Sequence, residues 1–123
     1  MRLLWLVACA WASAASALSA SEWVQVPFAL GPSKRRWHTA VFEKGFWIFG
    51  GDDGALKNDL WSFKTIKRMW LEMPQAQGTP WPSPRFSHMA VVQGGAMWVF
   101  GGVVQSGLSD DLWAFDFDLE RLD

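Results

Sequence analysis

The sequence predicts an all-β fold of about two four-stranded antiparallel sheets. The first observation is an internal repeat, because an irregular set of residues between positions 35 and 63 returns 50 to 52 positions later. The second is that apolar residues come in runs of four to six bounded by glycine, proline or charge, which is strand length and too short for helices. The repeated pairs are Arg35 and Arg85, His38 and His88, Ala40 and Ala90, Val41 and Val91, Gly50 and Gly101, Gly51 and Gly102, Asp59 and Asp111, Leu60 and Leu112, Trp61 and Trp113, and Phe63 and Phe115.

The apolar runs place the strands in order. The first repeat covers residues 35–74, with strands expected at residues 37–42, 46–49, 60–63 and 69–73. The second repeat covers residues 85–118 and offers only three runs, at residues 86–92, 96–100 and 112–117. A fourth strand is therefore missing, and the second repeat is expected to be incomplete.

Short glycine-containing turns join the first two strands of each repeat. They lie at residues 43–45 and 93–95, where glycine can adopt the positive φ of a tight hairpin. Sequential hairpins that are apolar on both faces predict sheets stacked between similar sheets, as in the blades of a β-propeller. Residues 23–27 match residues 70–74, so residues 21–27 are expected to form the last strand of a closing blade.

At these positions both repeats resemble the kelch repeat. The shared pattern is an early His, an apolar run into Gly-Gly, an Asp-Leu-Trp strand and a later Trp, and it extends from Trp23 to about Asp118. The resemblance implies a partial kelch-type β-propeller of about two blades, whereas a closed ring needs about four to eight. The chain has no Tyr, and Phe and Trp take its usual places. The linker from Gly78 to Arg85 is most similar to the leucine-zipper-like regulator and host-cell-factor type.

The N-terminal segment differs in composition from the repeats. Arg2 is followed by an apolar run from Leu3 to Ala12 and then by small residues, which is typical of a secretory signal peptide over residues 1–20. Cleavage after Ala17 or Ala20 would give a secreted or luminal protein. An uncleaved segment anchored in a membrane is the alternative.

No catalytic, metal or cofactor site is expected in this stretch. The two histidines hold equivalent repeat positions and should lie in adjacent blades, each bonded to neighbouring backbone, rather than converge on one ion. The Gly-Gly pairs lack the Lys-Ser or Lys-Thr of a phosphate loop. Asp59 and Asp111 are expected to accept backbone hydrogen bonds in the preceding turns. We assign a structural role to Trp23, His38, Gly50, Gly51, Asp59, Trp61, Trp70, His88, Gly101, Gly102, Asp111 and Trp113.

The remaining candidates lie in loops, which commonly carry function. Loops 28–34, 52–57, 75–84 and 103–109 should emerge on one face, and the resemblance implies that kelch propellers hold protein partners there. The candidate partner-binding residues are Lys34, Arg35, Asp52, Asp53, Lys57 and Trp81. These could equally be solvated loop residues.

The sequence predicts a protein-protein interaction module in the secretory pathway or outside the cell. A net charge of −1 argues against binding nucleic acid, since no basic excess is present to replace counterions. Two alternatives stay open. The chain could be the N-terminal part of a secreted propeller enzyme acting on carbohydrate, or a truncated fragment without function.

Overall fold

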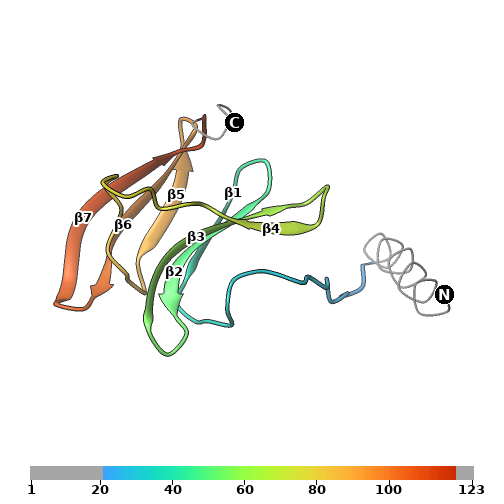
Figure 1. The fold of residues 1–123 in the computed structure, drawn as a ribbon, viewed down its shortest axis with the longest axis horizontal. Coiled ribbons are helices and arrows are strands. Elements are labelled where there is room, and N and C mark those ends of the chain that lie inside the picture. The colour runs from blue at the N-terminus through green and yellow to red at the C-terminus, as the bar shows by residue number, and fades with distance from the viewer. Residues whose placement is uncertain (1–20, 119–123) are drawn as a thin grey trace.

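The computed structural model describes residues 21–118 and contains two antiparallel β-sheets (Figure 1). The first sheet has the order β1-β2-β3-β4, with β1 at Thr39–Phe42, β2 at Phe46–Asp52, β3 at Leu56–Lys64 and β4 at Met69–Glu72. The second has the order β5-β6-β7, with β5 at Met89–Gln93, β6 at Ala96–Val104 and β7 at Gly107–Asp116. The predicted all-β fold of consecutive antiparallel strands, with a three-stranded second sheet, is confirmed.

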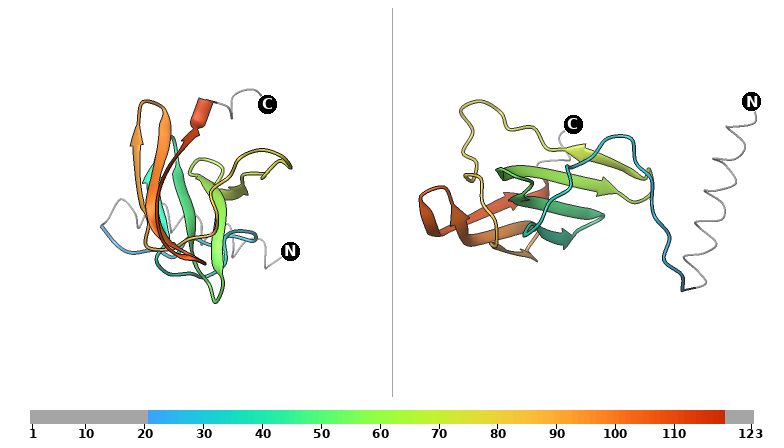
Figure 2. Two further views of the ribbon diagram at one scale, coloured as in Figure 1. Left: turned by 90° about the vertical axis from the view of Figure 1, so that its left-hand side faces the viewer. Right: turned by 90° about the horizontal axis from the view of Figure 1, so that it is seen from below.

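The two sheets lie side by side and are joined by a long linker after β4 (Figures 1 and 2). Their facing sides form the core, in which Trp47, Phe49 and Leu60 of the first sheet meet Met97 and Val99 of the second. Phe117, which follows the end of β7, completes this core. Strand register explains this pairing: Phe49 lies opposite Leu60, so both side chains leave the same face of the sheet. Each sheet is thus one blade packed on the next.

Most strand bounds differ from the sequence prediction. β3 and β7 begin four and five residues earlier than predicted, and β5 begins at Met89 rather than at position 86. β2 and β6 continue through their Gly-Gly pairs instead of ending there, because a register shift between Phe49 and Gly51 lets the chain bulge and pair again. As a result, the predicted loops 52–57 and 103–109 shrink to short turns at residues 53–55 and 105–106. β1 starts at Thr39 rather than at position 37, since Trp37 has a φ of 57° and breaks the extended run.

The N-terminal segment does not form the expected strand. Residues 22–28 are described by the structure but pair with no strand, and Trp23 is fully exposed. The strand predicted at residues 21–27 is therefore absent in this chain on its own, since no neighbouring edge engages it within residues 21–118. The predicted signal peptide, residues 1–20, lies outside the described residues.

Candidate functional site

Each repeat contains an Arg–Asp pair with a buried arginine, and this pair holds the Gly-Gly bulge. Arg35 Nη1 and Nη2 donate to the Asp59 carboxylate at 2.5 and 2.9 Å, and Nη1 also donates to the Gly50 carbonyl at 3.1 Å. Arg85 repeats this with Asp111, at 2.6 and 2.8 Å. The Arg35 side chain is almost fully buried, so its prediction as a partner contact is wrong: its donors are engaged within the blade.

The two aspartates also differ from expectation. They were predicted to accept backbone hydrogen bonds, but they accept from the arginine and from the indole N–H two residues later, on Trp61 and Trp113. The Arg85 hydrogen bonds, helped by Ser109 and Trp113, hold the pKa of Asp111 well below its usual range. Burial raises the pKa of Asp59, but hydrogen bonds from Arg35 and Trp61 outweigh it and the net direction is down. Both aspartates are therefore ionised structural groups.

The two histidines occupy equivalent positions in different surroundings. His88 is buried at the joint between the blades, with Nε2 2.7 Å from Thr39 Oγ1 and the Phe49 ring edge-on at 5.3 Å. Burial, followed by the positive charge of Arg85, lowers the pKa of His88 to about 4, so the ring is neutral near pH 7. The Nε2 contact goes to a side chain of the other blade, and the predicted bond to neighbouring backbone is represented by the Phe49 backbone, whose hydrogen bond acts to raise the pKa against these two causes. His38 lies exposed on the open side of the first blade.

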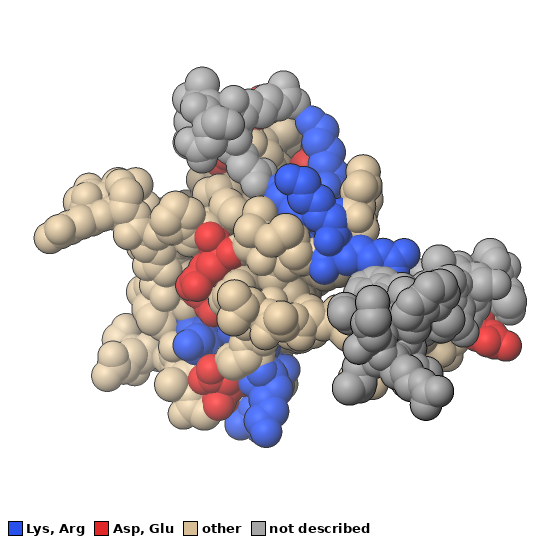
Figure 3. Space-filling model, turned by 45° about the vertical axis from the view of Figure 1, so that its right-hand side comes forward, with Lys and Arg blue, Asp and Glu red and all other residues tan. Residues whose placement is uncertain are grey.

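The predicted charged candidates at the β2–β3 turn form a local network. Asp53 accepts from Ser33 Oγ at 2.6 Å and from the Ala55 amide at 3.2 Å, and it lies 3.6 Å from Lys57 Nζ. The Ser33 hydrogen bond is the main reason that the pKa of Asp53 is lowered. Asp52 accepts from the Gly54 amide and from Arg36. In Figure 3 the lower end of the molecule, where this turn lies, carries acidic and basic side chains next to one another.

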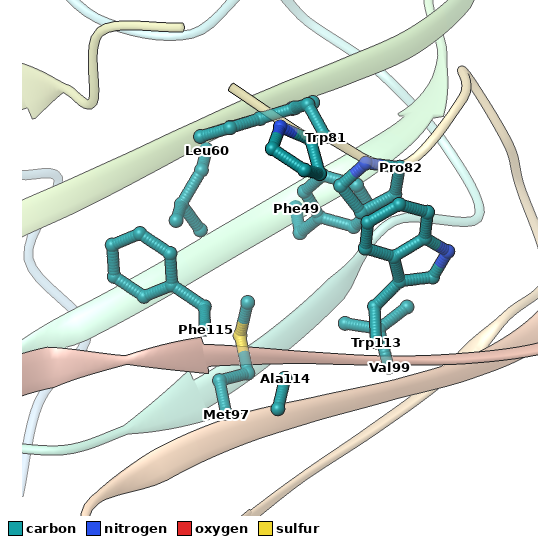
Figure 4. Close-up of a pocket in the computed structure, with 10 residues that line it drawn as sticks. Phe49, Leu60, Trp81, Pro82, Met97, Val99, Trp113, Ala114 and Phe115 are labelled. Atoms are coloured by element: carbon teal, nitrogen blue, oxygen red, sulfur yellow. The ribbon is translucent and has the colours of Figure 1, made fainter. Parts of the chain in front are cut away.

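Trp81 lies between the blades rather than at a free loop tip. Its indole N–H donates to the Asn58 carbonyl at 2.7 Å. With Pro82 it covers an apolar cavity of about 70 Å³ lined by core residues of both blades (Figure 4). Trp81 therefore fixes the linker of residues 75–84 to the first blade and belongs to the packing between the blades.

One exposed feature at the same end as the β2–β3 turn escaped the sequence prediction. Trp37 is 49% exposed, its ring stacks on Phe86 at 5.1 Å, and the Arg36 guanidinium lies 4.0 Å above it. Arg36 also pairs with Asp52 at 3.2 Å. Lys34 is exposed nearby in the chain and makes no hydrogen bond or ion pair within residues 21–118. We call Lys34, Arg36, Trp37, Asp52 and Phe86 the Trp37 surface.

A signal for Trp37 does exist in the sequence. Its counterpart in the second repeat is Ser87, and both residues adopt a positive φ, 57° and 54°. The backbone conformation belongs to the repeat, so the side chain there is free to vary. The difference between an exposed tryptophan and a serine at equivalent positions could have marked the site.

Two kinds of feature are absent from the described residues. Residues 21–118 hold no cluster of three or more His, Cys, Asp or Glu side chains arranged to bind a metal ion. No helix in that part of the chain is long and apolar enough to cross a membrane.

Comparison with known proteins agrees with this geometry. Residues 14–122 match the family model described as the KLHDC2/KLHL20/DRC7 Kelch-repeats domain. The chain is 43% identical over 72 residues to the leucine-zipper-like transcriptional regulator 1 homolog of Drosophila melanogaster, covering 57% of this chain and 7% of that protein. It is 40% identical over 80 residues to human host cell factor 2, covering 59% and 10%.

A third similar protein is multiple epidermal growth factor-like domains protein 8 of Rattus norvegicus, 37% identical over 78 residues, which cover 57% of this chain and 3% of that protein. The chain thus spans a tenth or less of the length of these relatives. The resemblance to leucine-zipper-like regulators and host cell factor is confirmed, and the chain belongs to the kelch-repeat family.

Proposed function

We propose that this chain binds a protein partner through the Trp37 surface and carries out no chemistry itself. Kelch repeats serve generally as protein-interaction modules, although a fold alone does not fix a function. We choose the Trp37 surface because of the side chains that are exposed at the β2–β3 end of the first blade.

The observation that carries the proposal is the exposed, supported ring of Trp37. Stacking on Phe86 and the overlying Arg36 hold the indole in place while half of it faces solvent. Tryptophan and arginine dominate binding energy at protein interfaces, and a side chain fixed beforehand loses little entropy on binding. Asp52, which pairs with Arg36, and the exposed Lys34, three residues before Trp37 in the chain, add charges of both signs, which suits the polar rim of an interface.

We place this activity in the secretory pathway or outside the cell. The support is the signal-peptide composition of residues 1–20. One similar protein has epidermal growth factor-like domains in its name, and such domains are typical of secreted proteins. Other similar proteins are named as a transcriptional regulator and a Ras guanine nucleotide exchange factor, so the N-terminal segment is the main argument.

The test is site-specific photocrosslinking in cells that express the chain with its own N-terminus. A photoreactive residue replaces Lys34 on the Trp37 surface or, as the matched control, the exposed Lys67 at the opposite end of the blade. We expect a protein adduct from position 34 that is missing from position 67 and is lost with Trp37→Ala but kept with Ile66→Ala. Equal labelling at both positions, or labelling that survives Trp37→Ala, would refute the proposed surface. Recovery of the chain only from the cytosol would refute the proposed location.

A further inference from the structure

Each blade has one face buried against the other blade and one face open to solvent. The residues on each open face are the repeat equivalents of the residues on the buried face of the other blade. In the first blade Trp47, Phe49 and Leu60 are 1 to 2% exposed because the second blade covers them. Their counterparts in the second blade are Trp98, Phe100 and Leu112, on the outer face, where they are 37 to 60% exposed. Contiguous exposed apolar residues of this kind mark interaction sites.

The other half of the interface is repeated in the same way. Met97 and Val99 of the second blade are 2 and 3% exposed against the first blade. The equivalent position to Met97 in the first blade is Phe46, which is 49% exposed on the opposite open side, with Ile48 beside it. Each open side therefore has most of the apolar side chains that the other open side would need as a partner, the exception being Thr65 at the repeat position of the core residue Phe117.

Within the described residues, the segment 22–26 and the outer edge of β7 also lack a pairing partner. In the first blade β4 pairs with the outer edge of β3, with Trp70 opposite Phe63 and their rings 5.1 Å apart. In the second blade the outer edge of β7 has no strand partner within residues 21–118. Residues 22–26 match the residues of β4 in sequence but remain unpaired, with Trp23 fully exposed. An unpaired edge readily accepts another strand.

We propose that copies of this chain pack head to tail, so that residues 22–26 of one copy add a fourth strand to β7 of another. Transferring the β3–β4 register predicts Trp23 opposite Phe115, Val24 opposite Ala114 and Gln25 opposite Trp113. The open side of the first blade then covers the open side of the second, as the two blades do within one chain. Such head-to-tail contacts build a ring when the rotation closes and a filament when it does not.

Two further positions in this arrangement fit less well, and the first of them provides a variant for the test. Glu22 would lie opposite Asp116, and like charges directly opposite weaken a strand pair. Within one chain His88 contacts the hydroxyl of Thr39. Between copies, His38 would take the place of His88 and Met89 that of Thr39, so the imidazole would face a thioether. The proposal does not use the exposed Trp37 ring, since it rests on the blade sides and the β7 edge, although Arg36 holds the repeat position of Phe86 at the joint.

The experiment uses cysteine pairs in the full chain with Cys9→Ser as background. Paired residues on neighbouring strands bring their Cα atoms within the range that a disulfide requires. Under mild oxidation, Val24→Cys mixed with Ala114→Cys should give a disulfide-linked dimer. The matched control is Gln25→Cys with Ala114→Cys, which we expect to link roughly tenfold less because adjacent strand residues point to opposite faces.

Two further measurements decide the outcome if the cysteine variants fold poorly. The wild-type chain should have a mass above that of a monomer by light scattering, and Glu22→Lys should raise that mass or the yield of linked dimer. A monomeric wild type, equal linking of both cysteine pairs, or a disulfide that closes within one chain of a Val24→Cys, Ala114→Cys double variant would overturn the proposal.

Discussion

Lowering the pH should weaken the joint between the two blades through the buried imidazole of His88. The pKa of His88 is about 4 in the folded chain against 6.5 for an ordinary histidine. Between these values the unfolded chain binds a proton that the folded chain does not, so stability falls as the pH falls. The contribution is fully present above about pH 6.5 and is lost as the pH approaches about 4.

The difference between the two pKa values sets the magnitude. At about 1.4 kcal/mol per pKa unit, protonation of His88 should lower the free energy of unfolding by about 3 kcal/mol at acid pH. Such a loss is a large part of the stability of a domain this small. Asp59 and Asp111 have lowered pKa values, so their contributions are lost only at still lower pH.

Urea unfolding at fixed protein concentration, at a series of pH values from about 7.5 to 4.5, measures this slope. His88→Gln should be less stable than wild type at neutral pH, because the Thr39 contact and the ring packing change, but its stability should depend much less on pH. His38→Gln is the matched control, since His38 holds the same repeat position on an open side. The reasoning would be refuted by a wild-type slope that persists in His88→Gln.

Three other predictions concern the stability of the fold, and urea or thermal unfolding measures each of them. Arg85→Met should cost about 1 to 3 kcal/mol, since it leaves the Gly101 carbonyl without a side-chain donor, while the partly exposed Asp111 carboxylate keeps Ser109 and Trp113. Leu60→Ala should cost about 3 kcal/mol by opening a cavity, whereas Leu112→Ala at the equivalent exposed position should cost under about 1 kcal/mol. Gly50→Ala should cost about 2 kcal/mol or more, because its Cβ would lie 2.8 Å from the Arg85 carbonyl oxygen. Gly54→Ala shares a positive φ but meets no atom within 4 Å, so it should cost less.

The internal repeat made most of the fold predictable. Apolar runs with turn residues between them located all seven strands, and hairpin turns fixed their antiparallel order. The sequence could not show that β2 continues past Gly50, because glycine usually weakens a strand and here the bulge restores pairing after one shifted residue. It also could not show that residues 22–28 stay unpaired, since pairing depends on a neighbouring edge and not on local preference.

The site was less predictable for a physical reason. The sequence predicts Arg35 as an exposed loop residue, because its partner Asp59 is 24 residues away and only the folded blade brings the two side chains together. The sequence places Trp37 at the start of a strand, because it is the first residue of the apolar run 37–42. Its exposure follows from a left-handed φ, which single-residue preferences do not predict for tryptophan.

Comparing the two repeats separates residues that join blades from residues that face a partner. Across the joint, the Gly51 amide donates to the Arg85 carbonyl at 2.8 Å and the Arg85 amide donates to the Lys57 carbonyl at 2.9 Å. Gly50 lies so close to His88 that any side chain there would collide with the ring. At the joint between the two blades Arg85, His88 and the first Gly-Gly pair are all engaged, which gives their recurrence a structural reason. Trp37 and Ser87 share a backbone conformation but not a side chain. The Trp37 ring stacks on Phe86 of the next blade while half of it faces solvent, so variation at this position can serve binding.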